Sequence, residues 1–221
     1  MRPALAAACL HVALVLPGAG EAGSLLTGLV APSPALGRPL AYSLYVPDHA
    51  AALQGRLPAV YLLHGHDGSD AQWREDGAIA VILDAMIALE EVPPLLAVMP
   101  AAGNGWYVDS RELGGPGDLE TAIVRDLVAH VEAVHGAAPR REARAIAGFS
   151  MGGYGALRLA FFHPDRFAAV ASLAGAIYPR LEAPSEGGRG GHDPAAIAAW
   201  YKGAFGTPPD PVIYAARSPF T

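Results

Sequence analysis

Cysteine is almost absent from this chain, with Cys9 as the only one among 221 residues. Cys9 lies within an apolar N-terminal stretch that has the pattern of a cleaved export signal. The mature chain would then contain no cysteine and could form no disulfide bond, even in an oxidising compartment. The apolar segment before Cys9 is too short for a lipoprotein leader, so we expect no lipid attachment there. Stability must therefore come from packing.

Charge is also scarce. Charged residues make up 16% of the chain, and the formal net charge is -6 with the arginines dispersed, which argues against nucleic-acid binding. No grouping of His, Cys, Asp and Glu has metal-ligand spacing, so the sequence implies no metal and no cofactor. After the N-terminal stretch, no segment offers the roughly 20 uninterrupted apolar residues of a transmembrane helix.

The first 22 residues have the pattern of a secretory signal peptide. A basic start at Arg2 precedes an apolar stretch from Ala4 to Leu16, and small residues suited to peptidase cleavage follow, with the cut expected near Ala22. The sequence therefore predicts a signal peptide over residues 1–22 and a mature domain over 23–221. We expect this domain to be secreted or periplasmic.

The mature chain has the organisation of one α/β domain. Its hydrophobic content of 52% and the lack of a second compositional block predict a single core. Extended apolar runs alternate with helical stripes at 79–87 and 123–134, which favours a mostly parallel sheet with helices on its faces. The expected strands are 24–30 and 40–46 as an antiparallel edge, followed by 57–63, 95–99, 143–149 and 168–173.

The most informative motif is the segment 148–152, Gly-Phe-Ser-Met-Gly, which follows a short apolar run and precedes a helical pattern. Strand, sharp turn and helix in this order form a nucleophile elbow, whose serine is strained and whose flanking positions must be small. The pentapeptide alone can occur by chance in a chain with 26 glycines, and the alternative is an ordinary tight turn. In its context it nominates Ser150 as a nucleophile.

A nucleophilic serine needs hydrogen-bond donors aimed at the oxygen that becomes charged in the tetrahedral intermediate. In this architecture one donor is the amide of the residue after the nucleophile, and another comes from a loop after an earlier strand. The buried run 57–63 ends in the glycine-containing segment 64–68, which can turn its amides inward. We therefore predict an oxyanion hole formed by the backbone amides of His66 and Met151.

Together these elements resemble the putative-esterase family of α/β-hydrolases. That family includes esterase D (S-formylglutathione hydrolase), feruloyl and acetyl-xylan esterases, and the antigen 85 mycolyltransferases. The resemblance extends from about Gly23 to the last residue and is specific in the combination of its motifs. These motifs are Tyr61-Leu62-Leu63-His64-Gly65, Val98-Met99-Pro100, Gly103-Asn104-Gly105-Trp106-Tyr107-Val108-Asp109-Ser110, Gly148-Phe149-Ser150-Met151-Gly152-Gly153-Tyr154-Gly155-Ala156 and His163-Pro164-Asp165-Arg166-Phe167-Ala168-Ala169.

The resemblance implies acyl transfer through a covalent ester on Ser150, without a cofactor. The substrate would be a small-molecule or carbohydrate-linked ester. An esterase and an acyltransferase of the antigen 85 type share all of these features, because they differ in whether water or an alcohol attacks the acyl-enzyme. No feature of the sequence indicates an oligomeric state.

The resemblance also suggests residues near the acyl pocket. Trp106 and Tyr107 resemble the family's loop beside that pocket, and Tyr154, next to the elbow, is expected to line it as well. The alternative for these substrate-binding candidates is aromatic packing beneath a loop. For Asp109 and Ser110, which continue the loop, we expect a capping or loop-bonding role.

The segment after Ser150 departs from the family. The triad there runs serine, acid and histidine, with the last two placed after later strands. Here an elbow helix, one strand, a glycine-rich loop and a short helix use up the residues that follow Ser150. We therefore expect a C-terminally incomplete member that lacks both partners and is nearly inactive as given, because the serine needs both to lose its proton.

Other histidines do not replace the missing base. His192 precedes a segment at 195–202 that resembles an insertion covering the active site, and Asp193 before a proline fits a helix N-cap. His163 follows the elbow helix, on the wrong side for the site. His64 has a position where family histidines orient the oxyanion loop and do not act as base.

A function of another class stays open, namely a secreted, non-catalytic binding protein that keeps the hydrolase scaffold without the acid and the histidine. The intact Gly-x-Ser-x-Gly counts against it, because a binding module has no need for a strained serine. Labelling by a fluorophosphonate probe would distinguish the two classes, since it requires an activated hydroxyl.

Overall fold

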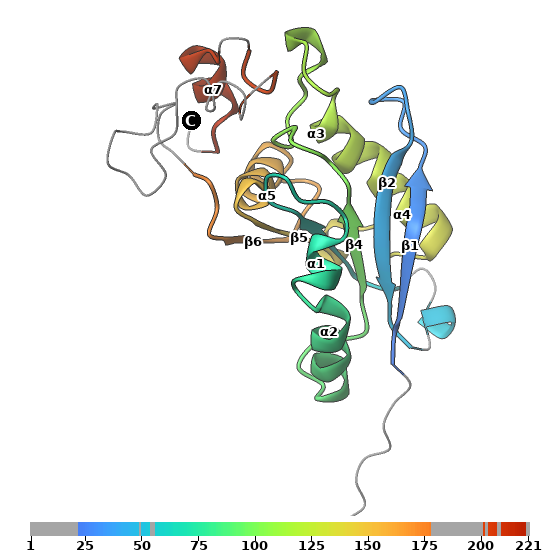
Figure 1. The fold of residues 1–221 in the computed structure, drawn as a ribbon. Coiled ribbons are helices and arrows are strands. Elements are labelled where there is room, and N and C mark those ends of the chain that lie inside the picture. The colour runs from blue at the N-terminus through green and yellow to red at the C-terminus, as the bar shows by residue number, and fades with distance from the viewer. Residues whose placement is uncertain are drawn as a thin grey trace, which may run out of the picture.

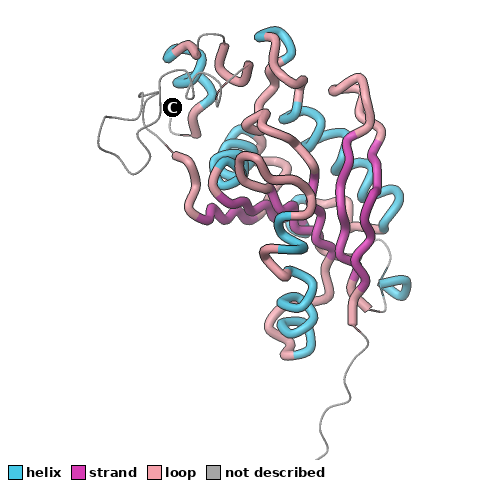
Figure 2. Tube along the Cα trace, in the orientation of Figure 1, coloured by secondary structure: helices cyan, strands magenta, loops and turns pink. Residues whose placement is uncertain are grey.

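The computed structural model describes residues 22–48, 50–53, 56–177, 201, 203–206 and 209–219. Within these residues the chain forms one six-stranded sheet with helices on both faces (Figure 1). The strands lie in the order β1-β2-β4-β3-β5-β6 across a twisted sheet (Figure 2). They are β1 (Ser24–Ala31), β2 (Leu40–Val46), β3 (Ala59–Leu63), β4 (Leu96–Pro100), β5 (Arg144–Phe149) and β6 (Ala169–Leu173).

The sheet is mixed. β1 pairs with β2 and β2 with β4 in antiparallel register, whereas β4 with β3, β3 with β5 and β5 with β6 pair in parallel. The predicted antiparallel edge and parallel centre are thus confirmed, and the strand bounds differ from those predicted by at most two residues. The largest difference is at the start of β3, where Leu57 forms only an isolated bridge to Ala137.

The helices follow the expected stripes. The described helical segments are η1 (Ala50–Leu53), α1 (Gln72–Glu75), α2 (Ile79–Ala88), η2 (Arg111–Leu113), α3 (Leu119–Thr121), η3 (Ala122–Leu127), α4 (Val128–His135), η4 (Arg141–Ala143), α5 (Met151–Phe162) and α7 (Pro211–Arg217). α3, η3 and α4 are continuous in the chain, with a π-helical middle. α5 ends at Phe162, two residues before Pro164, as the proline predicts.

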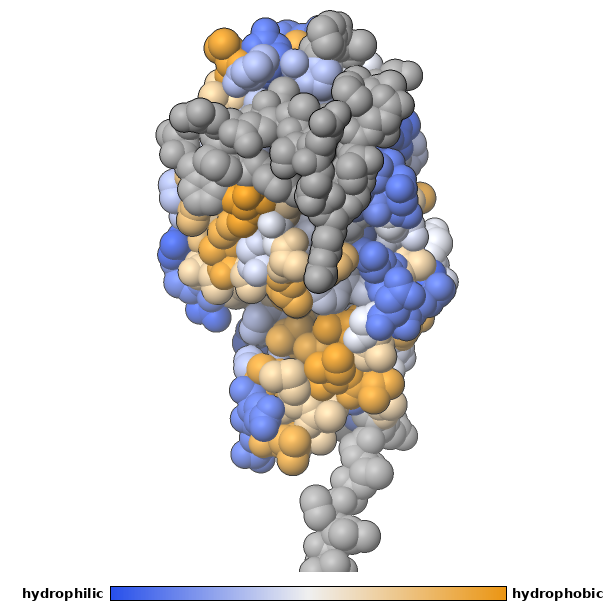
Figure 3. Space-filling view, turned by 60° about the vertical axis from the view of Figure 1, so that its left-hand side comes forward, coloured by the Kyte–Doolittle hydropathy of each residue, from blue (hydrophilic) through white to orange (hydrophobic). Residues whose placement is uncertain are grey.

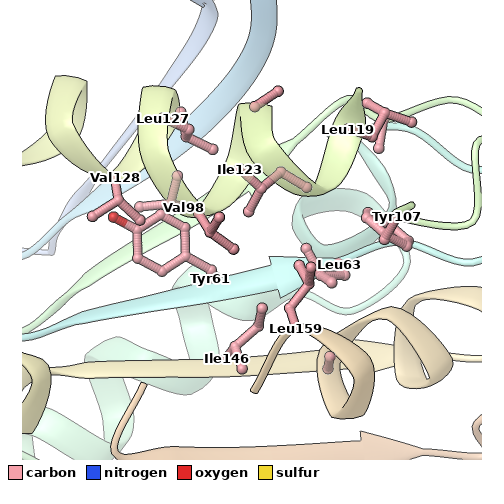
Figure 4. Packing of buried hydrophobic residues seen from close by; sticks show 14 of the residues in the cluster. Tyr61, Leu63, Val98, Tyr107, Leu119, Ile123, Leu127, Val128, Ile146 and Leu159 are labelled. Atoms are coloured by element: carbon pink, nitrogen blue, oxygen red, sulfur yellow. The ribbon is translucent and has the colours of Figure 1, made fainter. Parts of the chain in front are cut away.

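Alternation along the strands divides the core between the two faces of the sheet. Tyr61 and Leu63 face the large cluster formed with α3 to α5, whereas Leu62 between them faces a smaller cluster beneath α1 and α2. Figure 4 shows Tyr61, Leu63 and Ile146 directed toward side chains of the helical layer. The parallel strands therefore end at one edge of a sheet that is packed on both faces, which is where open α/β sheets bind ligands.

No helix among the described residues is both long and apolar enough to cross a bilayer. The predicted signal peptide at residues 1–22 lies almost entirely outside the described ranges and stays a prediction. His192, Asp193 and most of the segment 195–202 that resembles an insertion also lie outside the described ranges.

Candidate active site

Ser150 lies at a sharp turn between β5 and α5. Its backbone has φ 54° and ψ -116°, a conformation that a residue with a side chain adopts only at a cost. Three hydrogen bonds hold it: Ser150 N–H donates to Leu173 O at 2.9 Å, and Ser150 O accepts from Ala176 N–H at 2.9 Å and from Tyr154 N–H at 3.1 Å. The surrounding chain therefore fixes the strained turn expected of a nucleophile elbow.

The flanking glycines are required by close packing. A Cβ on Gly148 would overlap the carbonyl oxygen of Gly152, and a Cβ on Gly152 would overlap the carbonyl of Leu63 in β3. Strand β5, strand β3 and the first turn of α5 thus approach closer than any side chain allows. This is the steric reason for the small residues that the motif predicted.

The side chain of Ser150 is available for chemistry. Ser150 precedes α5 as its N-cap residue, yet its hydroxyl makes no capping hydrogen bond to the helix. The residue is partly exposed, and no hydrogen bond joins Oγ to any residue that the structure describes. Next to it, the amide of Met151 is the first of α5 and has no intrahelical acceptor, so the positive end of the helix dipole faces this turn.

The predicted oxyanion loop forms a β-turn over residues 65–68, in which Gly68 N–H donates to Gly65 O at 3.1 Å. Gly65 N–H donates to Gln72 Oε1 in α1 at 2.7 Å. Gly65 also lies against the elbow, since a Cβ there would meet the Phe149 ring at 3.2 Å. The turn that carries His66 is therefore next to the end of β5.

His64 holds this loop and is not placed to act as a base. Ala102 N–H donates to His64 Nε2 at 3.0 Å, so Nε2 carries no proton, and Nδ1 donates to Gly65 O at 2.7 Å. Burial lowers the pKa of His64 despite its bond to Gly65. The ring is thus neutral, with both nitrogens engaged, which agrees with the orienting role expected from the sequence.

The three aromatic candidates are buried beneath the site. Trp106 is 1% exposed, and its ring lies 5.6 Å from that of Tyr154 and 4.8 Å from that of Tyr201. Tyr107 OH donates to His64 O at 2.8 Å, and Tyr154 OH donates to Arg217 O at 2.6 Å. Aromatic packing under a loop is what the structure shows for Trp106, Tyr107 and Tyr154, and their contact with substrate stays a prediction.

Asp109 caps the start of the α3 helix. Its carboxylate accepts from Thr121 N–H at 2.9 Å and from the Thr121 hydroxyl at 2.6 Å, while Ser110 Oγ donates to Gly117 O at 3.0 Å. Both residues therefore have the capping and loop-bonding roles that we expected of them.

No base for Ser150 is found among the described residues. His163 follows the last residue of α5, about 20 Å along that helix from Ser150. There its Nε2 lies 2.8 Å from Glu120 Oε1, in a cluster that also contains Arg158. His163 is thus on the wrong side for catalysis, as predicted, and the structure describes no acid or histidine that contacts the Ser150 hydroxyl.

Two hollows flank the loop and the elbow. One, of about 330 Å³, is lined by Gln72, Trp73, Asp76, Gly77, Phe149 and Leu173. Phe149 and Leu173 are 43% and 45% exposed, and apolar surface gathers on the side of the molecule where β6 lies (Figure 3). The other, of about 260 Å³, is polar and includes His66 and Asp67. Within the described ranges, His, Cys, Asp and Glu do not gather in threes that could hold a metal ion.

Comparison with known proteins agrees with this geometry. The chain is 32% identical over 135 residues to esterase Rv1288 of Mycobacterium tuberculosis (strain ATCC 25618 / H37Rv), covering 60% of this chain and 28% of that protein. It is 34% identical over 153 residues to the MPT51/MPB51 antigen of Mycobacterium bovis (strain ATCC BAA-935 / AF2122/97), covering 68% of this chain and 46% of the antigen. The chain thus spans less than half the length of these curated relatives.

Among solved structures, a ferulic acid esterase superposes with a TM-score of 0.65 at 27% identity, covering 75% of this chain and 63% of that chain. Residues 33–216 match the family model described as "Putative esterase". This match covers far more than half of the chain and includes both the turn at 65–68 and the turn at Ser150. The chain therefore belongs to the putative esterase family, with the α/β-hydrolase fold.

Proposed function

We propose that this chain is a serine carboxylic-ester hydrolase that forms an acyl-enzyme on Ser150. The observation that carries the proposal is the strained backbone of Ser150 together with a hydroxyl that caps nothing. Strain of this kind costs about 1–3 kcal/mol and concentrates at active sites. An ordinary turn, or a binding module, has no need for it, so the geometry favours the catalytic interpretation of the motif.

In the proposed reaction, Ser150 Oγ attacks the carbonyl carbon of the ester. The carbonyl oxygen becomes negative and is stabilised by the amide of Met151, at the N-terminus of a 12-residue helix, and by the amide of His66. Collapse of the intermediate expels the alcohol and leaves the acyl group on Ser150. Water then attacks this ester, releases the acid and restores the serine.

The proton of Ser150 must pass to a base, and the described residues contain none at hydrogen-bond distance. Loss of the triad histidine lowers turnover by on the order of a millionfold, leaving what the oxyanion hole and binding provide. We therefore propose that the acid and the histidine of a triad are missing for Ser150 and that the chain turns over esters slowly. Small-molecule or carbohydrate-linked esters are the proposed substrates, without a cofactor.

The test is hydrolysis of p-nitrophenyl acetate by the 221-residue chain, by Ser150→Ala and by Ser69→Ala, a nearby exposed serine. We expect slow turnover that Ser150→Ala abolishes and Ser69→Ala leaves unchanged. Equal rates in all three proteins would contradict the nucleophile. Turnover at the rate of an ordinary esterase, lost in both Ser150→Ala and His192→Ala, would instead show that the chain contains its base.

A sugar acceptor in the same assay distinguishes the two fates of the acyl-enzyme. Free acid as the product supports a hydrolase. An acylated sugar as the product would show that the chain is an acyltransferase instead. Catalysis at Ser150 in either form would exclude the non-catalytic binding protein.

We also propose that residues 1–22 are a signal peptide and that the mature protein is secreted or periplasmic. The basic start and apolar stretch of this segment support the proposal. N-terminal sequencing of the exported protein should begin at Gly23, and retention of Met1 on a protein found only in the cytoplasm would contradict it.

A further inference from the structure

The turn that carries His66 contains a strained residue. Asp67 is the third residue of the hydrogen-bonded turn over residues 65–68, and its φ is 60°. A positive φ at the third position is a requirement of type II turns, which glycine normally meets without cost. Aspartate tolerates this conformation better than most residues but still adopts it at a cost. Contacts from outside the turn must therefore keep Asp67 in place.

Asn104 supplies these contacts from a loop 37 residues further along the chain. The backbone N–H of Asp67 donates to Asn104 Oδ1 at 2.8 Å, and Asn104 Nδ2 donates to Asp67 Oδ1 at 2.8 Å. The other carboxylate oxygen, Asp67 Oδ2, lies 3.1 Å from His66 Nδ1. One amide side chain thus holds both the main chain and the side chain of Asp67.

The charge state of Asp67 agrees with this arrangement. The hydrogen bond from Asn104 is the largest cause that holds the pKa of Asp67 below its ordinary value, followed by the contact with His66. The carboxylate is therefore ionised at neutral pH and accepts from both neighbours.

The first half of the turn is held separately, from α1. Gln72 Oε1 accepts the N–H of Gly65 at 2.7 Å, as described above. His66 lies between this anchor and the pair formed by Asp67 and Asn104. The N–H of His66 shares a peptide plane with Gly65 O, which accepts from His64 Nδ1 at 2.7 Å and from Gly68 N–H at 3.1 Å. The next plane, between His66 and Asp67, is held by the bond to Asn104, so its release removes one of the contacts that keep the direction of the His66 amide.

We propose that Asn104 is a positioning residue for the oxyanion hole: by clamping Asp67 in its left-handed conformation, it aims the His66 amide at the carbonyl oxygen of the ester. This inference rests on the proposed function and adds to it a second residue, besides His64, that orients one of the two donors. Asn104 acts through Asp67 and touches no reacting atom.

A swap of the two side chains tests the clamp. Asn104→Asp places a second carboxylate against that of Asp67. Asp67→Asn keeps an oxygen for Asn104 Nδ2. The double variant, Asp67→Asn with Asn104→Asp, again offers one amide and one carboxylate, keeps an acceptor for the backbone N–H of residue 67, and preserves the net charge. Asp165→Asn, at an exposed carboxylate distant from the site, is the control for loss of one charge.

Two quantities are measured in each protein: the second-order rate constant for labelling of Ser150 by a fluorophosphonate, and hydrogen exchange at the amide of residue 67. Asn104→Asp should slow labelling by about tenfold, because it loses the hydrogen bond from Nδ2 and sets two carboxylates against each other, and it should speed exchange. Asp67→Asn, the double variant and the control should remain within about threefold of the unmodified chain.

Two results would overturn the inference. One is a normal labelling rate in Asn104→Asp despite faster exchange at residue 67, and the other is a double variant as slow as Asn104→Asp. If the unmodified chain is not labelled at Ser150 while exchange is still rescued in the double variant, the proposed function fails and Asn104 has a structural role only.

Discussion

Gly152 lets α5 start directly against β3. A Cβ there would overlap backbone atoms of Leu63 and His64, which belong to the central strand and the segment after it and cannot move aside independently. Gly37 differs, because its φ is 67° and a Cβ there would have no heavy atom within 4 Å. An alanine at position 152 would therefore suffer steric overlap, whereas an alanine at position 37 would suffer only conformational strain.

We therefore predict that Gly152→Ala lowers the free energy of unfolding by about 3 kcal/mol, the upper end of the usual range for overpacking, because the new Cβ meets backbone atoms. Gly37→Ala should cost only about 1 kcal/mol, because it introduces conformational strain without a clash. Urea unfolding followed by circular dichroism measures both. Similar values for the two variants would contradict the close approach at the elbow.

At the residue scale, the sequence was informative where a local motif determines the geometry. Gly148, Ser150 and Gly152 are close in the chain, so the elbow could be predicted from their spacing. The bond between Asn104 and Asp67 joins residues 37 positions apart and produces no periodic signal. The positive φ of Trp106 and Tyr107, 55° and 57°, was equally hidden, because aromatic residues seldom adopt it.

Helix α5 is anchored at its far end by a buried ion pair. Arg158, 6% exposed, contacts Glu120 of α3 through Nη2 at 2.7 Å and through Nε at 3.1 Å. Arg158 Nη1 also donates to the carbonyl of Arg217, the last residue of α7, at 2.5 Å. These contacts join α3, α5 and α7 behind the elbow.

Removing one partner of this pair should be more costly than removing both. We predict that Glu120→Leu or Arg158→Leu alone lowers the free energy of unfolding by about 3–5 kcal/mol, because the remaining buried charge loses its main partner. Arg158 then keeps only the carbonyl of Arg217, and Glu120 keeps only His163. The double variant should recover a large part of this loss. A double-mutant cycle by urea unfolding at pH 7 measures the coupling free energy between the two residues. A double variant whose loss of stability equals the sum of the two single losses would contradict the prediction.

At the element scale, buried parallel strands were predicted to within two residues, because each is a short apolar run with clear bounds. The start of the long helical segment formed by α3, η3 and α4 was predicted less accurately. Its predicted stripe began at 123, but the helical segment starts at Leu119, where buried Glu120 faces Arg158 rather than solvent. From sequence alone, a glutamate in the first turn is assigned to the solvent-exposed face of a helix. The buried side of this turn could not be recognised without knowing that Arg158 pairs with Glu120.

Three histidines have lowered pKa values, one beside the elbow and two that lie together next to β2. Burial is the main cause for His64, His130 and His135, and the last is lowered further by His130. His130 Nε2 and His135 Nε2 lie 3.0 and 2.7 Å from the hydroxyl of Tyr42 in β2. When both rings are neutral, one Nε2 can accept the hydrogen bond from the Tyr42 hydroxyl while the other donates to its oxygen. A protonated ring can only donate, so protonation of both rings leaves the hydroxyl without an acceptor among them.

The whole molecule should therefore lose stability in mild acid. Each of these histidines has a folded-state pKa below the ordinary 6.5, so its contribution is complete above pH 6.5 and is lost as the pH falls through the folded-state value. We predict a fall in the free energy of unfolding below pH 6.5, which becomes shallower in His130→Gln/His135→Gln. An unchanged pH profile in this variant would contradict the assignment.

For the whole molecule, the sequence predicted the fold better than it predicted the surroundings of the candidate site. The motifs predicted the α/β-hydrolase sheet and the strained turn at Ser150, whereas the oxyanion hole stays a prediction. Burial of Trp106 and Tyr154 depends on packing with Tyr201 and Phe205, which no local pattern shows. The chain covers only part of its relatives, so the activity of the whole protein is a proposal that rests on Ser150.

The central claim is that Ser150 becomes acylated, and the most direct measurement traps this species. The chain is incubated with p-nitrophenyl acetate, quenched in acid and examined by intact-mass and peptide mass spectrometry. Because deacylation also needs a base, the acyl-enzyme should accumulate. We predict one acetyl group per chain, on the peptide that contains Ser150, and none on that peptide in Ser150→Ala. Acetylation of that peptide to the same extent in both proteins would contradict the account.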